Sequence, residues 1–419
     1  MTLMMLLVFG ALLVLALPVG YALVISSGLA AVTVGGMPSV AAVVKIFQPT
    51  QSFPLLAIPF FMLSGSLMMG GTLGKRLINF ATMLVGRFHG GLGQVTVVGS
   101  TVFGGVSGSA VAEASALGSM LIPWQKREGY PAAFAAAATA SSSVIAGLIP
   151  PSIPLILYAA VSNQSIAALF LAGLVPGLML CAGFMLCCYF SGRLRGFKRL
   201  TEVVTLKGVL RATVSAAPAL AMPAFIVILL RAGIATPTEV SVLAVFYGLV
   251  VSMLVYRDLS LRRLYDALFH TAVTTGVVML VIAASNLVGF VLTVEAVPTA
   301  VAEWTVETLK SPWMVILMLN LIMVTVGMFL DLPAAILLLG PTFVAIGNAI
   351  GLDLVQLGIM MAVNLSIGLF TPPVGTTLFI AAAISREKVG AVVRELWPFY
   401  LVAITVLGLI SFVPAFTFY

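Results

Sequence analysis

Charged residues are scarce in this sequence: Asp, Glu, Lys and Arg make up only 8% of its 419 residues. Soluble domains carry about 25% charged residues, so this composition excludes a cytosolic or secreted globular enzyme. Histidine and cysteine are also rare, with 2 and 3 copies, and they show no metal-ligand spacing. Apolar side chains, in contrast, reach 61%. The composition predicts an all-α polytopic membrane protein.

The few charges are unevenly placed. Twelve of the 20 basic residues fall in three short segments between apolar runs, 75–87, 193–211 and 257–263. Basic loops of membrane proteins lie preferentially in the cytoplasm. We therefore attribute the net charge of +7 to the orientation of the protein in the lipid of a bacterial inner membrane, and we predict no nucleic-acid partner. Both uncharged termini then fall on the periplasmic side. Lys45 and Arg231 are exceptions, because this topology does not place them in the cytoplasm.

Glycine and proline are frequent, at 39 and 22 copies, and they interrupt apolar runs at matching places. Gly147-Leu-Ile-Pro-Pro151 is echoed by Gly368-Leu-Phe-Thr-Pro-Pro373, and Gly108 is matched by Gly327. We therefore expect two repeats, 1–192 and 213–419, joined by a basic cytoplasmic linker, 193–212. Each repeat would hold three helices, a re-entrant hairpin, a broken helix and a closing helix. Such a unit crosses the membrane an odd number of times, so the second copy is inverted.

The expected segments of the first repeat are helices 3–17, 19–34 and 53–69, hairpin 89–123, broken helix 131–160 and helix 166–192. Those of the second are helices 213–231, 238–256 and 270–293, hairpin 311–350, broken helix 355–385 and helix 392–418.

The two helix breaks, at 147–151 and 368–373, leave carbonyl groups without intrahelical partners. In a membrane such groups survive only where protein, water or an ion covers them. Carbonyls and hydroxyls form an uncharged cage that suits Na⁺ better than a divalent metal. Kinked packing alone is the other reading of these residues, but it would not recur at matching offsets. We predict no cofactor beyond Na⁺ as coupling ion, with sodium site 1 at Ser107, Ser109, Gly147 and Pro150, and site 2 at Gly327, Gly368, Thr371 and Pro372.

Half-helix N-termini at the midplane would attract an anionic substrate through their partial positive charge, without Lys or Arg. No Lys or Arg falls inside either hairpin or either broken helix. The candidate substrate contacts are Ser141, Ser142, Asn364, Thr376 and Thr377, each of which could equally bond a neighbouring helix.

Three acids need separate interpretation. Glu239 ends Thr236-Pro-Thr-Glu239, which predicts a capping box. Asp331 is expected at the N-cap of the second hairpin's return arm, and Glu113 in the first turns of the other return arm. A proton or gating role stays open for Glu113 and Asp331, because acids at membrane depth are costly.

Together, the stretches 107–123, 147–152, 236–239 and 364–375 resemble the large membrane subunit of tripartite ATP-independent periplasmic (TRAP) transporters, over essentially the whole chain. The resemblance implies an elevator-type, Na⁺-driven importer of an organic acid. It also implies two partners, a small membrane subunit of four helices and a periplasmic substrate-binding protein, with this chain as an unfused large subunit. The family's sodium ligands lie in the same motifs, and Asp331 occupies the family's acidic position after the second hairpin tip.

Two alternatives remain. A stand-alone sodium/dicarboxylate-type symporter would share the architecture without a binding protein. An intramembrane serine protease would use Ser107 in Gly105-Val-Ser-Gly108 with His89 or His270 as base. Both histidines are expected at cytoplasmic helix ends, away from a midplane serine, so we expect a transporter and not an enzyme. Nothing in the motifs identifies the organic acid.

Overall fold

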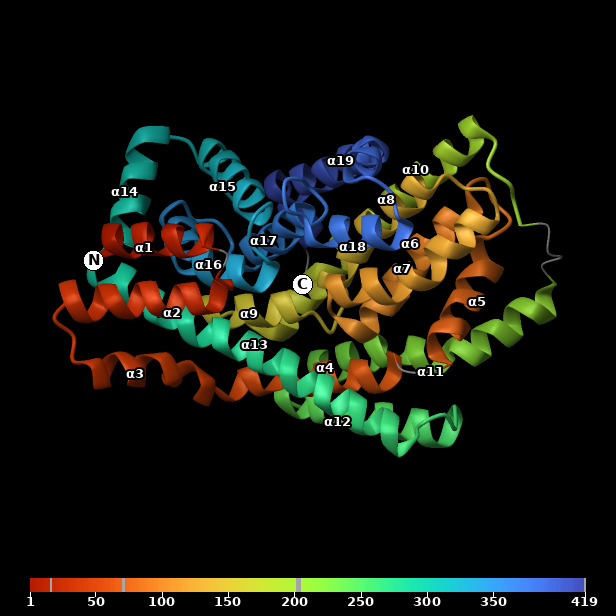
Figure 1. Ribbon diagram of the computed structural model, residues 1–419, viewed down its shortest axis with the longest axis horizontal. Helices are drawn as coiled ribbons and strands as arrows, with labels where there is room; N and C mark the ends of the chain where they lie inside the picture. The colour runs from red at the N-terminus through yellow and green to blue at the C-terminus, as the bar shows by residue number, and fades with distance from the viewer. Residues whose placement is uncertain (16, 70–71, 201–204, 418–419) are drawn as a thin grey trace.

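The structure, a computed structural model, describes residues 1–15, 17–69, 72–200 and 205–417. Within these ranges every regular element is helical, which confirms the predicted all-α class (Figure 1). Over the described residues, six helices are apolar and long enough to cross the roughly 30 Å core of a bilayer. They are α10 (Ile166–Arg195), α11 (Leu206–Arg231), α12 with a π-helical turn (Pro237–Val255), α13 (Leu261–Val294), α16 (Leu332–Ala349) and α19 (Val389–Phe412).

Shorter helices, together with α16, build two hairpins and two broken helices at the Gly and Pro interruptions. In the hairpins, α6 (Gly91–Ser107) turns into α7 (Ala110–Arg127), and α15 (Pro312–Gly327) turns into α16. In the first broken helix, α8 (Ala132–Ser142) continues through a 3₁₀ turn (Ser143–Gly147) and stops before α9 (Ile153–Ser162). In the second, α17 (Leu354–Leu369) stops before α18 (Thr376–Ser385).

The N-terminal part contains α1 (Thr2–Val14), α2 (Val19–Leu29) with a π-helical turn (Ala30–Val34), and α4 (Ala57–Met69). Three further helices lie where the sequence predicted only connections: α3 (Ser39–Phe47), α5 (Leu73–Val85) and α14 (Val297–Leu309). α5 buries Leu77 and Ala81 while Lys75 stays exposed, and it makes an angle of 74° with the helical segment Phe53–Met69. Counting apolar runs misses helices that are apolar on one face only.

Two long helices begin earlier than predicted. α13 starts at Leu261 instead of 270, and α11 starts at Leu206 instead of 213. The Oγ of Ser260 caps α13 by accepting a hydrogen bond from the N–H of Arg263 at 3.3 Å, and Thr205 caps α11 in the same way. Caps of this kind start a helix in polar sequence, before the apolar run begins. Between α10 and α11, part of the predicted linker 193–212, namely 201–204, lies outside the described residues.

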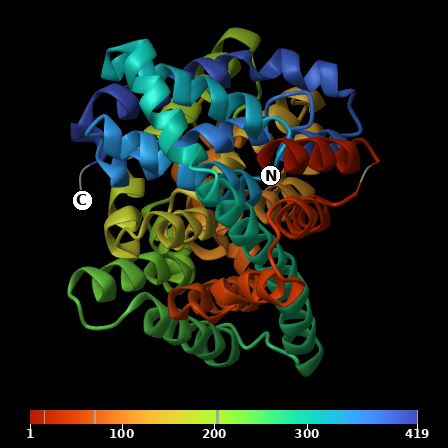
Figure 2. The ribbon, with the colours of Figure 1, turned by 90° about the vertical axis from the view of Figure 1, so that its left-hand side faces the viewer.

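The core lies around α8 and α17. Every residue of α8 from Phe134 to Ser142 and every residue of α17 from Val355 to Leu369 is buried. The alanines of α8 let neighbouring helices approach closely. α3, α4, α11 and α12 lie along one side of the molecule, and α15 and α19 lie along the other (Figures 1 and 2). α13 runs between these sides and packs against α2, α4 and α16.

Candidate functional site

The first hairpin has a tight tip that rests on the first helix break. α6 ends at Ser107, Gly108 has a left-handed φ of +60°, and α7 begins after Ser109. The Oγ of Ser109 accepts a hydrogen bond from the N–H of Ala112 at 3.4 Å. A Cβ on Gly108 would lie 2.2 Å from the carbonyl oxygen of Pro151. Only glycine therefore fits here, and it brings the Ser107 and Ser109 hydroxyls next to the break.

The first break is organised by a residue that the sequence analysis did not select. Ser152 is the N-cap of α9, and its Oγ accepts from the N–H of Leu155 at 3.3 Å and donates to the carbonyl of Gly147 at 2.5 Å. The Gly147 carbonyl therefore has one hydrogen-bond partner and one lone pair left for a ligand. The signal for Ser152 was its place after Pro-Pro and before an apolar helix, which is typical of an N-cap.

The second tip and second break are also in direct contact. α15 ends at Gly327 and α17 ends one residue after Gly368. A Cβ on Gly368 would lie 2.4 Å from the Gly327 carbonyl oxygen, so the two backbones touch. Thr371 donates its N–H to the Gly368 carbonyl at 3.0 Å and its Oγ1 to the Ile367 carbonyl at 2.6 Å. Pro372 follows in the same turn, and the peptide bonds Pro150–Pro151 and Pro372–Pro373 are both cis.

Both tips and both breaks meet at one small cavity of about 210 Å³. Three helix N-termini contribute to its lining: Ser109 to Val111 at the start of α7, Ile153 and Pro154 at the start of α9, and Leu332 and Pro333 at the start of α16. Gly147, Asp331 and Leu369 lie at the edges, and Thr274, Val277 and Val278 of α13 close the remaining side. Unpaired N–H groups and the dipoles of three helices make such a cavity attractive to an anion.

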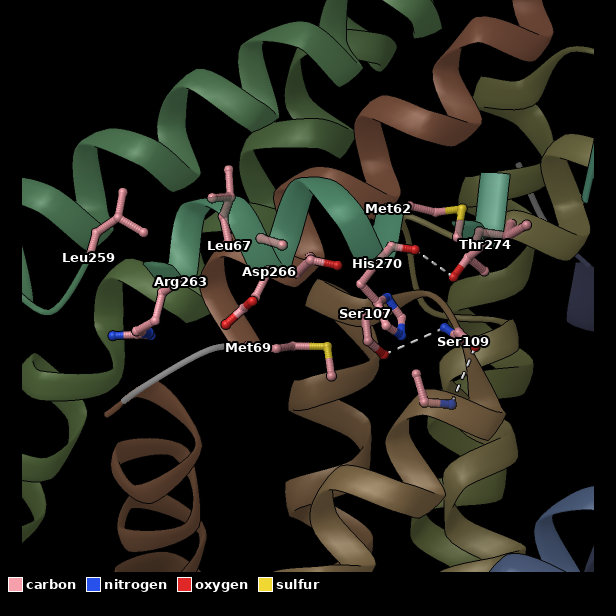
Figure 3. A pocket seen from close by; sticks show the side chains of 15 residues that line it. Met62, Leu67, Met69, Ser107, Ser109, Leu259, Arg263, Asp266, His270 and Thr274 are labelled. Carbon is pink, nitrogen blue, oxygen red and sulfur yellow. Dashed lines mark hydrogen bonds between the residues drawn. The ribbon is translucent and has the colours of Figure 1, made fainter. Parts of the chain in front are cut away.

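A larger cavity of about 460 Å³ adjoins the first and shares Met62, Ser109, Ile153 and Thr274 with it (Figure 3). Ser107 and Ser109 of the first hairpin line one wall. Arg263, Asp266 and His270, one face of α13, line the opposite wall. The ring of His270 is directed from α13 toward the hairpin tip (Figure 3).

The prediction that His270 lies at a helix end was wrong. It lies in the third turn of α13, because α13 begins at Leu261, and it shares a cavity with Ser107. The view that the site region contains no basic residue also needs correction. The hairpin tips and breaks contain none, but α13, which is distant in sequence, brings Arg263 and His270 to the cavity. Only the tertiary fold reveals this.

Arg263 is held at the cavity by the loop before α13. Its Nη1 lies 3.4 Å from Oδ1 of Asp258, and Nη2 is buried without a hydrogen-bond partner among the described residues. Asp258 also accepts hydrogen bonds from the N–H and Oγ1 of Thr72, at 2.8 and 2.9 Å. Partial burial raises the pKa of Asp258, but the Thr72 donors and Arg263 outweigh it and hold that pKa below its usual value. The carboxylate thus stays charged and fixes Arg263.

The three acids differ in their surroundings. Glu239 forms the predicted capping box, with its Oε2 accepting from the N–H and Oγ1 of Thr236 at 2.7 and 2.8 Å. Asp331 occupies the N-cap position of α16, as predicted, and lines the small cavity, but its side chain makes no capping hydrogen bond. Glu113 is fully buried, and neither carboxylate oxygen has a hydrogen bond of normal geometry among the described residues, although Ser100 lies beside it.

None of the five candidate substrate contacts lines either cavity at the tips. Ser141 donates to the Ala137 carbonyl at 2.8 Å, Ser142 lies 3.0 Å from the Ser100 hydroxyl, and Thr377 donates to Ala140 and Leu369 carbonyls. Asn364 donates to Asn320, and Thr376 has no hydrogen-bond partner among the described residues. Most of these side chains therefore form hydrogen bonds with the backbone of their own or a neighbouring helix, and not with a cavity.

Ser366 on α17 is a further residue that the sequence analysis missed. Its Oγ is buried without a hydrogen-bond partner among the described residues, and it lies 3.3 Å from where a Cβ on Gly147 would be. It thus connects the second broken helix with the first break. The described residues contain no group of three His, Cys, Asp or Glu side chains that could hold a metal ion.

Comparison with known proteins agrees with this architecture. Residues 6–416 match the family model described as "Tripartite ATP-independent periplasmic transporter, DctM component". A Sinorhizobium fredii protein, y4mL, is 51% identical over the full length of both chains. The C4-dicarboxylate TRAP transporter large permease protein DctM of Pseudomonas aeruginosa is 37% identical over 372 residues, 89% of this chain and 87% of that one. The crystal structure of the Alcanivorax borkumensis YdaH transporter has a similar fold, with a TM-score of 0.59, 14% identity, and coverage of 89% of this chain and 87% of that one.

Proposed function

This chain belongs to the DctM family of large TRAP transporter components, and from that premise we propose that it moves an organic acid across the bacterial inner membrane together with Na⁺. It is a multi-pass membrane permease for organic acids and not an enzyme. The observation that carries the proposal is the convergence of three helix N-termini and both hairpin tips on one cavity. That cavity offers N–H groups and dipoles to a carboxylate and oxygen atoms to Na⁺ on the same elements.

Two groups of oxygen atoms support the Na⁺ coupling. At site 1, Ser109 and Gly147 line the same cavity, and the Pro151 carbonyl lies against Gly108, between Ser107 and Ser109. At site 2 the Gly327 and Gly368 backbones are in contact, and the Thr371 hydroxyl and Pro372 lie in the following turn. Na⁺ bound at either place would hold a tip against a break. Substrate and ion then stabilise the same arrangement, which is how two ligands become coupled.

Matching elements support inverted repeats at 1–192 and 213–419. A hairpin followed by a broken helix occurs in each half, and each tip touches the break of its own half. In the proposed elevator, the hairpins and broken helices move together against α13 and α4. The surfaces between them are suited to sliding, because α13 presents mostly apolar side chains between its polar ends.

The orientation follows from the basic segments 193–211 and 257–263, which we place in the cytoplasm with both termini in the periplasm. The larger cavity extends from the first hairpin tip to Leu259 and Arg263, at the cytoplasmic end of α13. In this orientation the structure represents the inward-facing state, in which Arg263 and His270 receive the departing anion. We therefore place the substrate contacts at these residues, Thr274 and the helix N-termini.

The family implies a small membrane component and a periplasmic binding protein as partners. This chain matches only 64% of the length of one relative, the isethionate TRAP transporter permease protein DctMQ of Oleidesulfovibrio alaskensis, with 35% identity over 403 residues. We propose a small four-helix component at this chain and a binding protein that delivers the substrate. Relatives are named for C4-dicarboxylates, 2,3-diketo-L-gulonate and sialic acid, so we propose a carboxylate as substrate class.

The test is reconstitution in proteoliposomes with the small component and the binding protein. Uptake is measured for succinate, 2,3-diketo-L-gulonate and sialic acid, each with an inward gradient of Na⁺ or of K⁺ as control. We expect uptake of one acid that requires Na⁺ and all three proteins. Uptake by this chain alone would favour a stand-alone symporter. Equal uptake with an inward Na⁺ gradient and with an inward K⁺ gradient would contradict the proposed coupling.

A further inference from the structure

A second polar cavity lies toward the other end of α13. It measures about 580 Å³ and lies between α13, the segment that holds Lys45 and Gln48, the end of α9 and the middle of α16. It shares no lining residue with the two cavities at the hairpin tips. α13 contributes Ser285, Asn286 and Thr293 to its wall. Neither the family motifs nor the proposed site accounts for this polar surface.

Lys45 gives the cavity a positive charge without a paired carboxylate. Its Nζ lies 3.3 Å from Oε1 of Gln48 and 5.3 Å from the ring centroid of Phe290. None of the ion pairs among the described residues includes Lys45. Asn286 fixes this segment to α13, because its Nδ2 donates to the Lys45 carbonyl at 2.6 Å. Lys45 is also one of the two basic residues that the predicted topology does not place in the cytoplasm. A role of its charge in this cavity would explain its position.

Ser285 adds an independent observation. Its side chain is 5% exposed and lines the cavity, and its hydroxyl has no hydrogen-bond partner among the described residues. A buried hydroxyl without a partner is unfavourable, so it points to a ligand that is bound in another state. An ammonium and a hydroxyl are donors that suit a carboxylate.

Three helices, α9, α13 and α16, contribute lining residues both to this cavity and to the small cavity at the tips. On each helix a residue of the small cavity has a counterpart eight or nine residues farther along in the second cavity: Ile153 and Val161 on α9, Leu332 and Pro341 on α16, and Val278 and Asn286 on α13. At 1.5 Å per residue, these eight or nine residues correspond to about 12 to 14 Å on each helix. A slide of this size would bring the N-termini of α9 and α16 next to Asn286.

We propose that Lys45, Ser285 and Asn286 form a carboxylate-binding subsite that faces the substrate in the outward state. This subsite rests on the proposed function, because it requires that the N-termini of α9 and α16 move toward Lys45 while Lys45 stays in place. Arg263 and His270 serve the same purpose at the opposite end of α13. The substrate anion thus meets a basic group at each end of its path and none between.

The charge of the subsite is tested with a cysteine at Gly289, which lines the cavity and has no atom within 4 Å of an added Cβ. In a background without Cys181, Cys187 and Cys188, the modification rate is measured with methanethiosulfonate reagents carrying a sulfonate or a trimethylammonium group. With Lys45 present, we expect the sulfonate reagent to be favoured. Lys45→Gln should lower the sulfonate-to-ammonium rate ratio by on the order of tenfold, and Lys45→Arg should restore it.

Gly276→Cys is the matched control, because it lies on the same helix, also meets no atom within 4 Å, and is not in the cavity. Its rate ratio should not respond to Lys45→Gln. An unchanged ratio at position 289 would overturn the proposed charge. In the uptake assay, Lys45→Gln should raise the KM for external substrate about tenfold, and an unchanged KM would overturn the role in substrate binding. If the unmodified chain shows no Na⁺-dependent uptake, the proposed function fails, whereas the labelling result still decides whether the cavity attracts anions.

Discussion

The backbones of Gly327 and Gly368 touch: a Cβ on Gly368 would lie 2.4 Å from the Gly327 carbonyl oxygen. Gly327 ends the first arm of the second hairpin, and Gly368 lies in the last turn before the second break. This contact joins two segments that are 41 residues apart in sequence. It also places the Gly327 carbonyl oxygen against Gly368, where the second proposed Na⁺ site needs an oxygen ligand.

Gly368→Ala should therefore abolish Na⁺-dependent uptake. The added methyl group meets backbone atoms that cannot yield, and overpacking of this kind costs about 1–3 kcal/mol. Gly408→Ala in α19 is the control, because its Cβ would meet no atom within 4 Å. That control should retain uptake and be as stable or slightly more stable to heat, since alanine favours helix. Normal uptake by Gly368→Ala would contradict the tight contact.

Ser109→Ala and Thr371→Val should weaken Na⁺ activation while leaving expression intact. Each removes one hydroxyl from a proposed Na⁺ site, and we expect the Na⁺ concentration for half-maximal uptake to rise about tenfold, or about 1.4 kcal/mol. Ser109→Thr and Thr371→Ser keep the hydroxyl and should stay within about threefold of the unmodified protein, below 1 kcal/mol. Unchanged Na⁺ activation in both hydroxyl-free variants would remove the ion-site assignment.

Arg263→Gln should weaken substrate binding from the cytoplasmic side. Arg263 lines the larger cavity with a buried Nη2 that lacks a protein partner among the described residues, whereas the neighbouring Arg262 is exposed and does not line it. Counterflow from substrate-loaded vesicles should show an increase of about tenfold in the internal KM for Arg263→Gln, as expected for the loss of a charged hydrogen bond of about 1.5 kcal/mol. Arg262→Gln should behave as the unmodified protein. An equal increase of the internal KM in Arg263→Gln and Arg262→Gln would indicate an effect of overall surface charge and not a binding site at Arg263.

Asp258→Asn should destabilise the loop that holds Arg263, modestly and in a pH-dependent way. The pKa of Asp258 is lowered, because Thr72 and Arg263 outweigh the opposing effect of burial. The carboxylate therefore stabilises the fold above its unfolded pKa of about 3.9, and this contribution is lost as pH falls through the lower folded pKa. For this partly exposed pair we expect less than about 1 kcal/mol. Thermal unfolding in detergent should separate the variants at pH 7, and the difference should shrink as the pH falls below the unfolded pKa of about 3.9. A difference that stays constant with pH would contradict the ion pair.

The tips and breaks could be located from sequence because their chemistry is local. Gly108 requires a left-handed φ, Pro interrupts a helix wherever it falls, and the Thr236–Glu239 capping box spans four residues. These constraints act within a few residues, so a sequence pattern reveals them.

The basic wall of the larger cavity could not be found in this way. Arg263 and His270 lie more than 150 residues from Ser109, and only the path of α13 brings them together. Arg263 was expected in a connection and His270 at the start of a helix, because apolar runs marked the helix start too late. The polar residues Ser141 and Thr377 looked like substrate contacts because a sequence shows that a hydroxyl exists and not which carbonyl accepts its hydrogen bond.

The most direct test of the central claim is disulfide trapping of the first hairpin against two positions of α13. Ala112 and Thr274 line the same cavity now, whereas Ser285 lies eleven residues, or about 16 Å, farther along α13. A disulfide requires Cα atoms within about 7 Å, so a static protein cannot form both crosslinks. We predict that the pair Ala112→Cys and Thr274→Cys crosslinks readily, and that Ala112→Cys and Ser285→Cys crosslinks when Na⁺ and substrate allow turnover. Crosslinking of the first pair only, in a protein that still transports, would contradict movement of the site along α13.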